Sequence, residues 1–327
     1  MIRQRKRHNS IYFLCKNCKK YFSVNIIWFP KKQILKDHLS GLSFKDLGDK
    51  YSVSKSKAYR ICKEELRKLP DNNKITFKYC NRFSSLFEFD AKYINVKGYE
   101  RKIAFLWGVD YERHDFPIIL LARSESYESW AKFFELFRII NHYPRLIICD
   151  DNSPLKIAAR YKFPEVKIQT CYNHFKEGIR RVLKVRSDDT YKNFSREIDQ
   201  LLSVKRSTQD FNNFLFKIYE YHKNDPVKLQ IIVNLEKRKN EFLAFQGYRR
   251  APVTTNMIEG FNSHLEQRLK HINSFNSFEH AKLWLNAYVL KRRCTKLTDC
   301  KSRFRFLNGK IPLHMTKKVD VDLPTFF

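Results

Sequence analysis

Several features are scarce in this chain of 327 residues. Glycine occurs eight times, and no loop has the glycine spacing of a nucleotide-binding P-loop, which argues against a P-loop motor. No stretch approaches eighteen uninterrupted apolar residues, so we expect no membrane span. The N-terminus lacks the apolar core and small-residue cleavage site of a signal peptide. With eight irregularly spaced cysteines, the protein is expected to be cytoplasmic and to keep its thiols reduced.

Acidic side chains are also few relative to basic ones. The 64 lysines and arginines outnumber the 34 aspartates and glutamates, so the formal net charge is +30, spread along the whole chain. A lysine-rich proteome accounts for part of this excess, but the remainder favours a polyanionic partner, of which nucleic acid is the common one. Hydrophobic residues make up 43% of the chain, enough for a substantial core. We therefore expect a folded nucleic-acid-binding protein of two or three domains.

The basic segment 1–30 contains one Cys-x-x-Cys pair, Cys15 and Cys18 in "CKNC". Such a pair supplies two of the four ligands of a tetrahedral zinc ion. His8 lies nearby, but the surrounding sequence offers no second pair. Segment 1–30 therefore predicts a partial zinc-ribbon-like segment, which either binds Zn²⁺ or is vestigial.

Residues 31–70 show three helical patterns. Two short helices come first, the second capped by Ser43, and after the turn "SVS" a longer helix begins near Ser54. This order is typical of a helix-turn-helix, whose last helix enters the DNA groove. A plain three-helix bundle with a solvated face is the alternative. The candidate DNA-binding residues are the polar side chains at the start of the last helix: Lys55, Ser56, Lys57, Tyr59 and Arg60.

From residue 84 onward, the pattern changes to apolar strands. Helical patterns precede the fourth and the fifth strand, which gives the order β-β-β-α-β-α-β followed by helices. Three antiparallel strands feeding parallel strands are the plan of a ribonuclease-H-like α/β domain with a mixed sheet. Residues 71–83 read as a linker, and residues 294–327 as a less patterned tail. The five predicted strands span residues 84–96, 101–112, 116–124, 145–151 and 166–171.

Acidic residues interrupt two of these strands. Asp90 lies in the middle of the first strand, where aspartate is disfavoured, and Asp150 and Asp151 end the fourth. In a ribonuclease-H-like sheet these two strands are neighbours, which would place Asp90 beside Asp150. Two adjacent carboxylates resist joint ionisation unless a cation lies between them. Hard oxygen ligands select Mg²⁺ or Mn²⁺, so we expect a divalent metal there.

A third acid, Glu259, lies in the helical stretch "TTNMIEGFNSHL". A helix-borne carboxylate would complete a pocket for two metal ions about 4 Å apart, the arrangement used for in-line phosphoryl displacement. Asp110, at the end of the second strand, is the main rival, although it reads equally well as a turn residue. The positions three and four residues from Glu259 hold no basic partner but instead Thr255, Asn256, Asn262 and Ser263.

These residues stand in motifs that resemble one known family, the prokaryotic insertion-sequence DDE transposases related to Mutator-like elements. The similarity covers about residues 84–293, and the preceding segments are similar in order. It implies a ribonuclease-H-like enzyme that cuts DNA at element ends and joins the freed 3′-OH to target DNA. The motifs are Asp90 in "FDAKYI", Asp150 in "CDDNSPLKIAA", Cys171 and His174 in "CYNHF", and Glu259 in "TTNMIEGFNSHL".

The resemblance assigns a role to each acid. Asp90, Asp150 and Glu259 would form the triad that binds two Mg²⁺ or Mn²⁺ ions. Asp150 is preferred to Asp151 because Leu155, Lys156 and Ala158 follow it at the family's spacing. The resemblance also implies a helical insertion over residues 176–249, which would divide the catalytic domain into residues 84–175 and 250–293.

Four polar residues near the triad have two readings each. In the family, Cys171 and His174 follow the last core strand, which implies a role near the active site or in positioning DNA. Taken alone, such a pair is more often structural, and one pair is a poor zinc site. Asn256 and Asn262 would either hold the glutamate or touch DNA, or they would serve as capping and helix-surface residues.

The expected partners are double-stranded element-end and target DNA, bound by a homodimer or a higher oligomer. This oligomeric state rests on family analogy. An inactive or truncated DNA-binding remnant, or a regulator, is the alternative. A nuclease that hydrolyses DNA without joining ends is the other.

Overall fold

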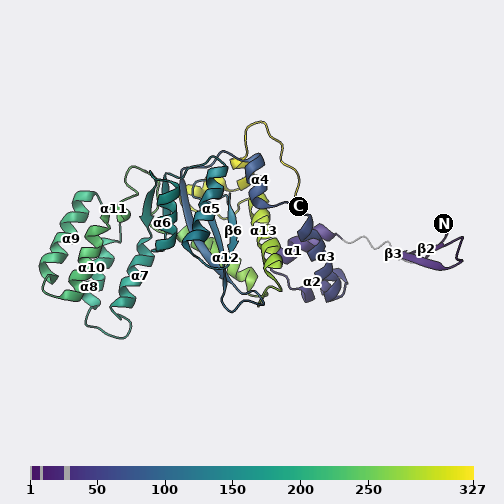
Figure 1. Ribbon diagram of the computed structural model, residues 1–327, viewed down its shortest axis with the longest axis horizontal. Coiled ribbons are helices and arrows are strands. Elements are labelled where there is room, and N and C mark those ends of the chain that lie inside the picture. Colours follow the sequence, from purple (N-terminus) through teal and green to yellow (C-terminus); the bar gives the residue numbers. More distant parts are fainter. Residues whose placement is uncertain (1, 8–9, 26–29) are drawn as a thin grey trace. The chain divides into compact units, whose positions relative to one another are not determined.

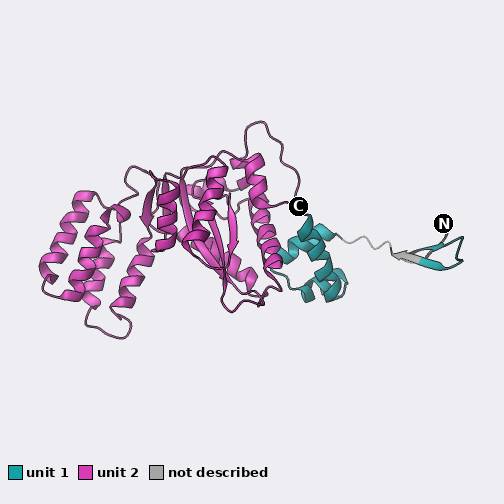
Figure 2. Ribbon diagram, viewed as in Figure 1, with its two compact units in different colours: residues 1–68, 327 teal, residues 69–326 magenta. Residues whose placement is uncertain are grey.

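The computed structural model describes residues 2–7, 10–25 and 30–327, which form two compact units. The first unit is made of residues up to Lys68, and the second of residues 69–326, as Figure 2 shows in two colours. No helix among the described residues is long and apolar enough to cross a membrane.

The first unit begins with a three-stranded antiparallel sheet. Cys15 and Cys18 lie at the turn between its last two strands, where the Cys15 N–H donates to the Lys20 carbonyl at 3.0 Å. Among the side chains that the structure describes, no third candidate ligand joins the two cysteines. His8 lies outside the described residues, as do the other parts of segment 1–30 at positions 1, 9 and 26–29. The strands are β1 (Ile2–Arg7), β2 (Ser10–Leu14) and β3 (Tyr21–Asn25).

Three helices complete this unit and match the predicted order of two short helices and a longer one. Ser43 caps the second helix as predicted, because its hydroxyl accepts from the Asp46 N–H and Asp46 accepts from the Ser43 N–H. Ser52, at φ 51°, ends that helix in the left-handed region. The role of the group as a helix-turn-helix stays a prediction. The helices are α1 (Lys31–Leu39), α2 (Phe44–Tyr51) and α3 (Lys55–Lys68).

The second unit is built on a mixed five-stranded sheet with the order β6-β5-β4-β7-β8. The pairs β4–β5 and β5–β6 are antiparallel, while β4–β7 and β7–β8 are parallel. The predicted meander is therefore confirmed, as is the neighbourhood of the first and fourth strands. The strands are β4 (Leu86–Ile94), β5 (Ile103–Asp110), β6 (Ile119–Ala122), β7 (Leu146–Cys149) and β8 (Lys167–Thr170).

One face of this sheet is largely apolar. Phe87 and Phe89 of β4 pack in a buried cluster with aromatic residues of α5 (Tyr127–Ile139), and α6 (Ser153–Lys162) covers the same face. Gly108 lies opposite Phe89, and a Cβ there would lie 2.1 Å from the ring, so a larger residue would displace it. Because successive residues point to opposite faces, Glu88 and Asp90 lie on the other face.

That other face is covered by α12 (Asn256–Leu269), which carries Glu259. Phe261 of this helix packs edge-on against Phe116, and Phe116 stacks on Trp107 of β5. Helix α13 (Phe278–Cys294) follows. The sheet thus separates an apolar layer from a layer in which acids meet α12.

Between β8 and α12 the chain forms the predicted helical segment. Figure 1 shows α8, α9 and α10 side by side at one end of the second unit. The segment leaves and rejoins the core at one place, because the Tyr172 N–H donates to the Val253 carbonyl at 2.9 Å. Apolar side chains of these helices, such as Phe194, Phe211 and Ile218, are buried in one cluster. The helices are α7 (Tyr172–Val182), α8 (Lys192–Leu201), α9 (Thr208–His222), α10 (Pro226–Lys237) and α11 (Lys239–Phe242).

Two segments are more ordered than the sequence indicates. Residues 71–83, expected to be a linker, contain α4 (Asn72–Tyr79), because Asp71 acts as an N-cap rather than as a helix breaker. The tail expected over residues 294–327 contains a 3₁₀ helix, η1 (Ser302–Leu307), and α14 (Pro312–Thr316).

A buried polar network joins α4, α13 and α14. Arg293 of α13 is fully buried, and its guanidinium binds both carboxylate oxygens of Asp115 at 2.7 and 2.8 Å. The same guanidinium donates to Asn72 and Thr76 of α4, and the Thr316 hydroxyl of α14 donates to Asp115. The network thereby fixes α4 and α14 to α13.

Candidate active site

The parallel pairing of β4 with β7 brings Asp90 and Asp150 together. Glu88 pairs with Ile148, and continuing the register by two residues places Asp90 opposite Asp150, just beyond the carboxyl end of β7. Burial and then the Asp150 carboxylate raise the pKa of Asp90 to about 7, and burial also raises the pKa of Asp150. Among the described residues neither acid forms an ion pair with a lysine or an arginine. The two acids therefore form a strained pair that would bind a cation favourably.

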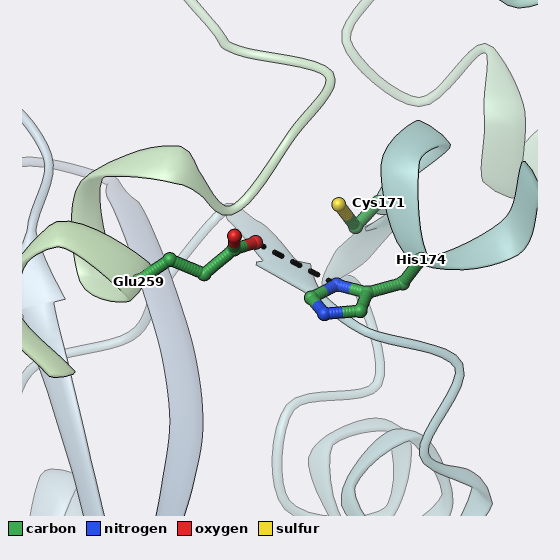
Figure 3. Close-up of side chains that lie close together, drawn as sticks. All are labelled: Cys171, His174 and Glu259. Atoms are coloured by element: carbon green, nitrogen blue, oxygen red, sulfur yellow. Dashed lines mark ion pairs between the residues drawn. The ribbon is translucent and has the colours of Figure 1, made fainter. Parts of the chain in front are cut away.

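Glu259 approaches this pair from α12, and His174 of α7 lies among the three acids. The Glu259 Oε1 is 3.7 Å from the His174 Nδ1, as drawn in Figure 3. A hydrogen bond with Cys171 raises the pKa of His174 to about 9, and the Glu259 and Asp150 carboxylates add to this rise. In return, the imidazolium opposes the rise in the pKa values of Asp90 and Asp150. The acids predicted from three distant parts of the sequence thus share one electrostatic environment.

Thr255 connects the same groups. It precedes α12 but makes no side-chain cap, because its hydroxyl donates to the Glu259 Oε1 at 2.6 Å. The Thr255 Oγ1 also lies 3.2 Å from the Cys171 sulfur and 3.3 Å from the His174 Nδ1. The threonine that reads as a capping residue in the sequence therefore holds the carboxylate of Glu259 in place.

Cys171 and His174 gain a third candidate metal ligand from α12. Ligand atoms of Cys171, His174 and Glu259 all lie within 4.8 Å of one another. Although burial opposes it, hydrogen bonds with His174 and Thr255 lower the pKa of the Cys171 thiol. A sulfur, a nitrogen and a carboxylate oxygen form a set that zinc uses in catalytic sites. Whether the pair binds zinc stays a prediction, but α12, distant in the sequence, places a carboxylate beside it.

The two asparagines of α12 differ in surroundings. The Asn262 Nδ2 donates to the Asp90 Oδ2 at 2.5 Å, and its Oδ1 accepts from the Trp107 indole at 3.1 Å. Asn256, in contrast, contacts the Asn173 amide at an exposed position, with its Oδ1 3.1 Å from the Asn173 Nδ2. Asn262 thus fixes α12 to β4 and orients the Asp90 carboxylate.

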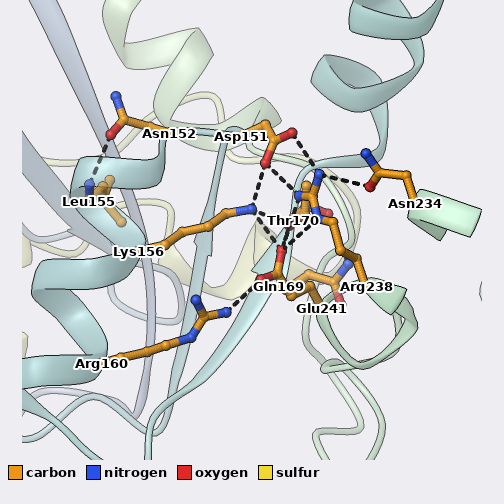
Figure 4. A network of polar contacts seen from close by, with 10 residues as sticks. All are labelled: Asp151, Asn152, Leu155, Lys156, Arg160, Gln169, Thr170, Asn234, Arg238 and Glu241. Atoms are coloured by element: carbon orange, nitrogen blue, oxygen red, sulfur yellow. Dashed lines mark hydrogen bonds and ion pairs between the residues drawn. The ribbon is translucent and has the colours of Figure 1, made fainter. Parts of the chain in front are cut away.

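Asp151 belongs to a separate ionic network, drawn in Figure 4. It accepts from the Lys156 ammonium at 2.7 Å and from the Arg238 guanidinium at 2.9 Å. Burial acts to raise its pKa, but the hydrogen bonds from Arg238 and Lys156 lower the pKa overall. Glu241 joins the same cations, and its pKa falls to about 2. Asp151 is therefore neutralised by protein cations, in contrast to Asp150.

Asp110, the rival third acid, is fully buried in a turn. Its carboxylate accepts backbone N–H groups of Ser84 at 2.6 Å, Glu112 at 3.0 Å and Arg113 at 3.1 Å. It pairs with Phe87 near the start of β4, away from Asp90. These contacts favour the turn reading of Asp110 over a place in the triad.

Comparison with known protein families gives a match to a family described as "Transposase, Mutator family" over residues 40–291. The match covers well over half of the chain. The chain belongs to this transposase family. No curated protein matches the chain significantly. Family membership confirms the resemblance and makes the protein a DNA-binding enzyme that cuts DNA.

The transposase carries a further buried acid that the sequence reasoning missed. Glu88 is fully buried, and its Oε2 accepts the Ile258 N–H at 2.9 Å. It therefore supplies the acceptor that Thr255 withholds from the first turn of α12. Burial raises the pKa of Glu88 to about 8, and its Oε1 has no hydrogen-bond partner. The signal in the sequence was the alternation "EFD", which puts Glu88 and Asp90 on one face of β4.

Replacing Glu88 tests this capping role. In Glu88→Ala the first turn of α12 loses its acceptor, which should lower the free energy of unfolding by about 1–3 kcal/mol. Glu88→Gln keeps an acceptor oxygen and should lose much less. Urea denaturation of both variants measures the difference. An equal loss in the two variants would show that the carboxyl group itself is required, because glutamine keeps both the size of the side chain and an acceptor oxygen.

A second acid that the sequence reasoning missed, Glu125, lies close enough to Asp90 and Asp150 to interact with both electrostatically. It accepts from the Asn152 amide at 2.8 Å, the Tyr93 hydroxyl at 2.5 Å and the Trp130 indole at 3.2 Å. Its carboxylate also acts to raise the pKa of Asp90. In the sequence it reads only as the residue before a helix. Since Asn152 caps α6 two residues after Asp150, Glu125 helps to fix the loop that carries Asp150.

The candidate DNA-contacting residues of the transposase lie in the first unit and start α3. Lys55, Ser56 and Arg60 are exposed, whereas Lys57 and Tyr59 are partly buried. Tyr59 packs edge-on against Phe44 of α2, with ring centroids 5.4 Å apart. Tyr59 therefore stabilises the helix group as well as reaching the surface.

Proposed function

We propose that this transposase cuts DNA at the ends of its element and joins the freed 3′-OH to target DNA, using Asp90, Asp150 and Glu259 as a metal-binding triad. The observation that carries the proposal is the strand register that places Asp90 opposite Asp150, with no lysine or arginine paired to either acid among the described residues. Glu259 lies 3.7 Å from His174, whose charge acts on both acids. The order of the mixed sheet, three antiparallel strands joined to two parallel ones, supports a ribonuclease-H-like fold for the second unit.

The donor set fits divalent magnesium or manganese. Asp90 and Asp150 offer carboxylate oxygens in a mostly buried place, and Glu259 can add a third, which is the chemistry that hard cations select. Asp151 offers the contrast, since protein cations already neutralise it. Two bound metal ions would lower the pKa of the attacking water or 3′-OH and stabilise the leaving oxygen.

The protein's own side chains position these acids. The Asn262 amide donates to Asp90 and orients its carboxylate. The Thr255 hydroxyl donates to the Glu259 Oε1, and the His174 Nδ1 lies 3.7 Å from the same oxygen. Glu88 fixes the first turn of α12 and therefore the place of Glu259 over the sheet. No covalent protein nucleophile is required.

Zinc bound by Cys171, His174 and Glu259 is the second candidate, since these ligand atoms lie within 4.8 Å of one another. It would withdraw Glu259 from the triad. The two readings differ in the metal that supports reaction and in the effect of Cys171→Ser, which replaces a zinc ligand but none of the triad acids. For the Cys15–Cys18 pair, binding of Zn²⁺ stays a proposal without a second pair of ligands.

We further propose that the first unit reads the element ends through α3, with Lys55, Ser56, Lys57, Tyr59 and Arg60 at the DNA. Scattered lysines and arginines would add a salt-sensitive grip on phosphates. Two copies of the chain would be needed to hold two element ends at once, so a homodimer or higher oligomer on DNA is part of the proposal.

A strand-transfer assay tests the function. Purified transposase, labelled element-end DNA and a supercoiled target should yield joined products with Mg²⁺ or Mn²⁺ and none with EDTA. The products are resolved on a sequencing gel. Cleavage without joined product would indicate a nuclease instead. Salt-sensitive binding without any metal-dependent cutting would indicate an inactive DNA-binding remnant.

A further inference from the structure

The second unit contains a concave site outside the acidic cluster. Its volume is about 560 Å³, within the range of roughly 300–1,000 Å³ that is usual for ligand pockets. Four arginines line it, against one acid, Glu112. The excess of positive charge suits an anionic ligand. We call it the arginine pocket, and its principal lining residues are Arg82, Arg113, Arg250, Arg303, Tyr111 and Phe306.

Most of the positive charge in this pocket is not neutralised by the protein. Arg82 and Arg250 are exposed, and neither forms an ion pair among the described residues. The Arg113 Nη1 is buried without a hydrogen-bond partner, and its nearest carboxylate oxygen, on Asp110, is 3.7 Å away. Arg303 donates to the Tyr111 hydroxyl and lies 4.9 Å from the centroid of that ring. The pocket therefore combines two cations without an ion pair in the described part of the chain, Arg82 and Arg250, with Arg303, which Tyr111 already orients.

An exposed aromatic ring accompanies these cations. Phe306 is 56% exposed, whereas Tyr111, which lines the same pocket, is buried. Cationic grooves with aromatic rings are the common means of binding single-stranded nucleic acid, because phosphates meet the cations and bases stack on the rings. A base inside a duplex is stacked and paired and cannot enter such a pocket. The chemistry thus favours an unpaired nucleotide.

The place of the pocket suits a strand that reaches the acids. Arg82 lies four residues before Leu86, where β4 begins, and β4 rises about 13 Å from Leu86 to Asp90 at roughly 3.3 Å per residue. Arg250 lies nine residues before Glu259 on the segment that enters α12. A nucleotide in the pocket would be a few steps from a phosphate at the acids. Arg303 and Phe306 lie beyond residue 291, outside the family match.

We propose that the arginine pocket binds one unpaired nucleotide of a DNA strand, with its phosphate on Arg82 and Arg250 and its base stacked on Phe306. The identity of the polyanion rests on the proposed function. The binding itself needs no metal and no reaction at the acids, so it can be measured separately from both.

Binding of fluorescein-labelled oligo(dT) and of a duplex without element ends, measured by anisotropy in EDTA, tests the proposal on the full chain. Arg82→Ala/Arg250→Ala should weaken oligo(dT) binding about tenfold and reduce the salt slope by about 0.7 for each lost phosphate contact. Phe306→Ala should weaken it about tenfold through lost stacking, with no change in salt slope. Duplex binding should change much less in both variants.

Matched substitutions outside the pocket provide the controls. Arg181 of α7 is exposed and has no ion pair among the described residues, and Phe216 of α9 is 62% exposed. Arg181→Ala and Phe216→Ala should leave oligo(dT) binding unchanged. Equal melting temperatures of all variants would show that folding is intact.

Three results would overturn the proposal. Weaker binding in the arginine variant, with no effect of Phe306→Ala, would mean a phosphate-binding patch without a base site. Equal losses for duplex and oligo(dT) would mean a general DNA surface. Competition by dTMP as strong as by oligo(dT) would mean a free-nucleotide site. Loss of strand transfer in triad variants, with oligo(dT) binding in EDTA retained, would separate this proposal from the proposed function.

Discussion

Strand transfer should fall by about 10³-fold or more in Asp90→Asn, Asp150→Asn and Glu259→Gln, since residues that act as one unit are each indispensable. For the same reason, a double variant should be no worse than either single variant. Binding of element-end DNA in EDTA should stay within about twofold, because the proposed DNA-reading residues lie in α3. The measurement is the rate of joined product with Mg²⁺.

The stability of Asp90→Asn, unlike its activity, should stay unchanged or rise. Burial and the neighbouring carboxylate raise the pKa of Asp90 to about 7, so ionised Asp90 is unfavourable in the folded protein. Its stabilising contribution is present below the unfolded pKa and is lost as the pH rises through 7. Asp90→Asn should therefore unfold at an equal or higher urea concentration than the wild type at pH 8. Loss of activity with retained stability is expected of a functional acid.

Asp151→Asn is the matched control, because it makes the same change at the adjacent residue. It breaks ion pairs with Lys156 and Arg238 and should lower stability, while strand transfer stays within about tenfold. If Asp151→Asn abolished strand transfer and Asp150→Asn did not, the second acid of the triad would have to be reassigned. Retained transfer in Glu259→Gln would remove Glu259 from the triad.

Arg293→Ala should lower the free energy of unfolding of the second unit by about 3–5 kcal/mol, because it leaves the Asp115 carboxylate buried without its cation. Both residues are fully buried, and the guanidinium also serves Asn72 and Thr76 of α4. Urea denaturation followed by tryptophan fluorescence measures the loss.

Lys282→Ala is the control on the same helix, since Lys282 is exposed and should contribute less than about 0.5 kcal/mol. Arg293→Ala should also release α14, because Thr316 donates to the same carboxylate. Proteolysis in the segment after residue 294 should accelerate accordingly. A loss no larger than that of Lys282→Ala would mean that water enters and solvates Asp115.

Much of the core could be predicted from local patterns. Strand β4 was found because apolar residues dominate "LFEFDAKYI", and Asp90 stood out because aspartate is disfavoured inside a strand. The capping of α2 by Ser43 was equally local. The partnership of Asp90 with Asp150 required a guess at sheet order, which the register of β4 and β7 bears out.

The contacts around Glu259 could not be predicted in this way. Thr255 reads as a cap from its neighbours in sequence, but its hydroxyl turns to Glu259 because Glu88, far earlier in the chain, takes over the N–H of Ile258. Asp71 was read as part of a linker for a similar reason, since the helix it begins is stabilised by Arg293. In each case the deciding partner is more than 150 residues away in the sequence.

The hydrogen bond between Tyr172 and Val253 has a consequence for how this enzyme can diversify. The helical bundle of α8, α9 and α10 leaves and rejoins the core at this hydrogen bond. Its length and shape can therefore change while the spacing between Tyr172 and Val253 stays constant. Related enzymes can therefore exchange this bundle for another without shifting the glutamate that follows it. Grafting a foreign bundle between Tyr172 and Val253 would be a practical route to altered binding partners.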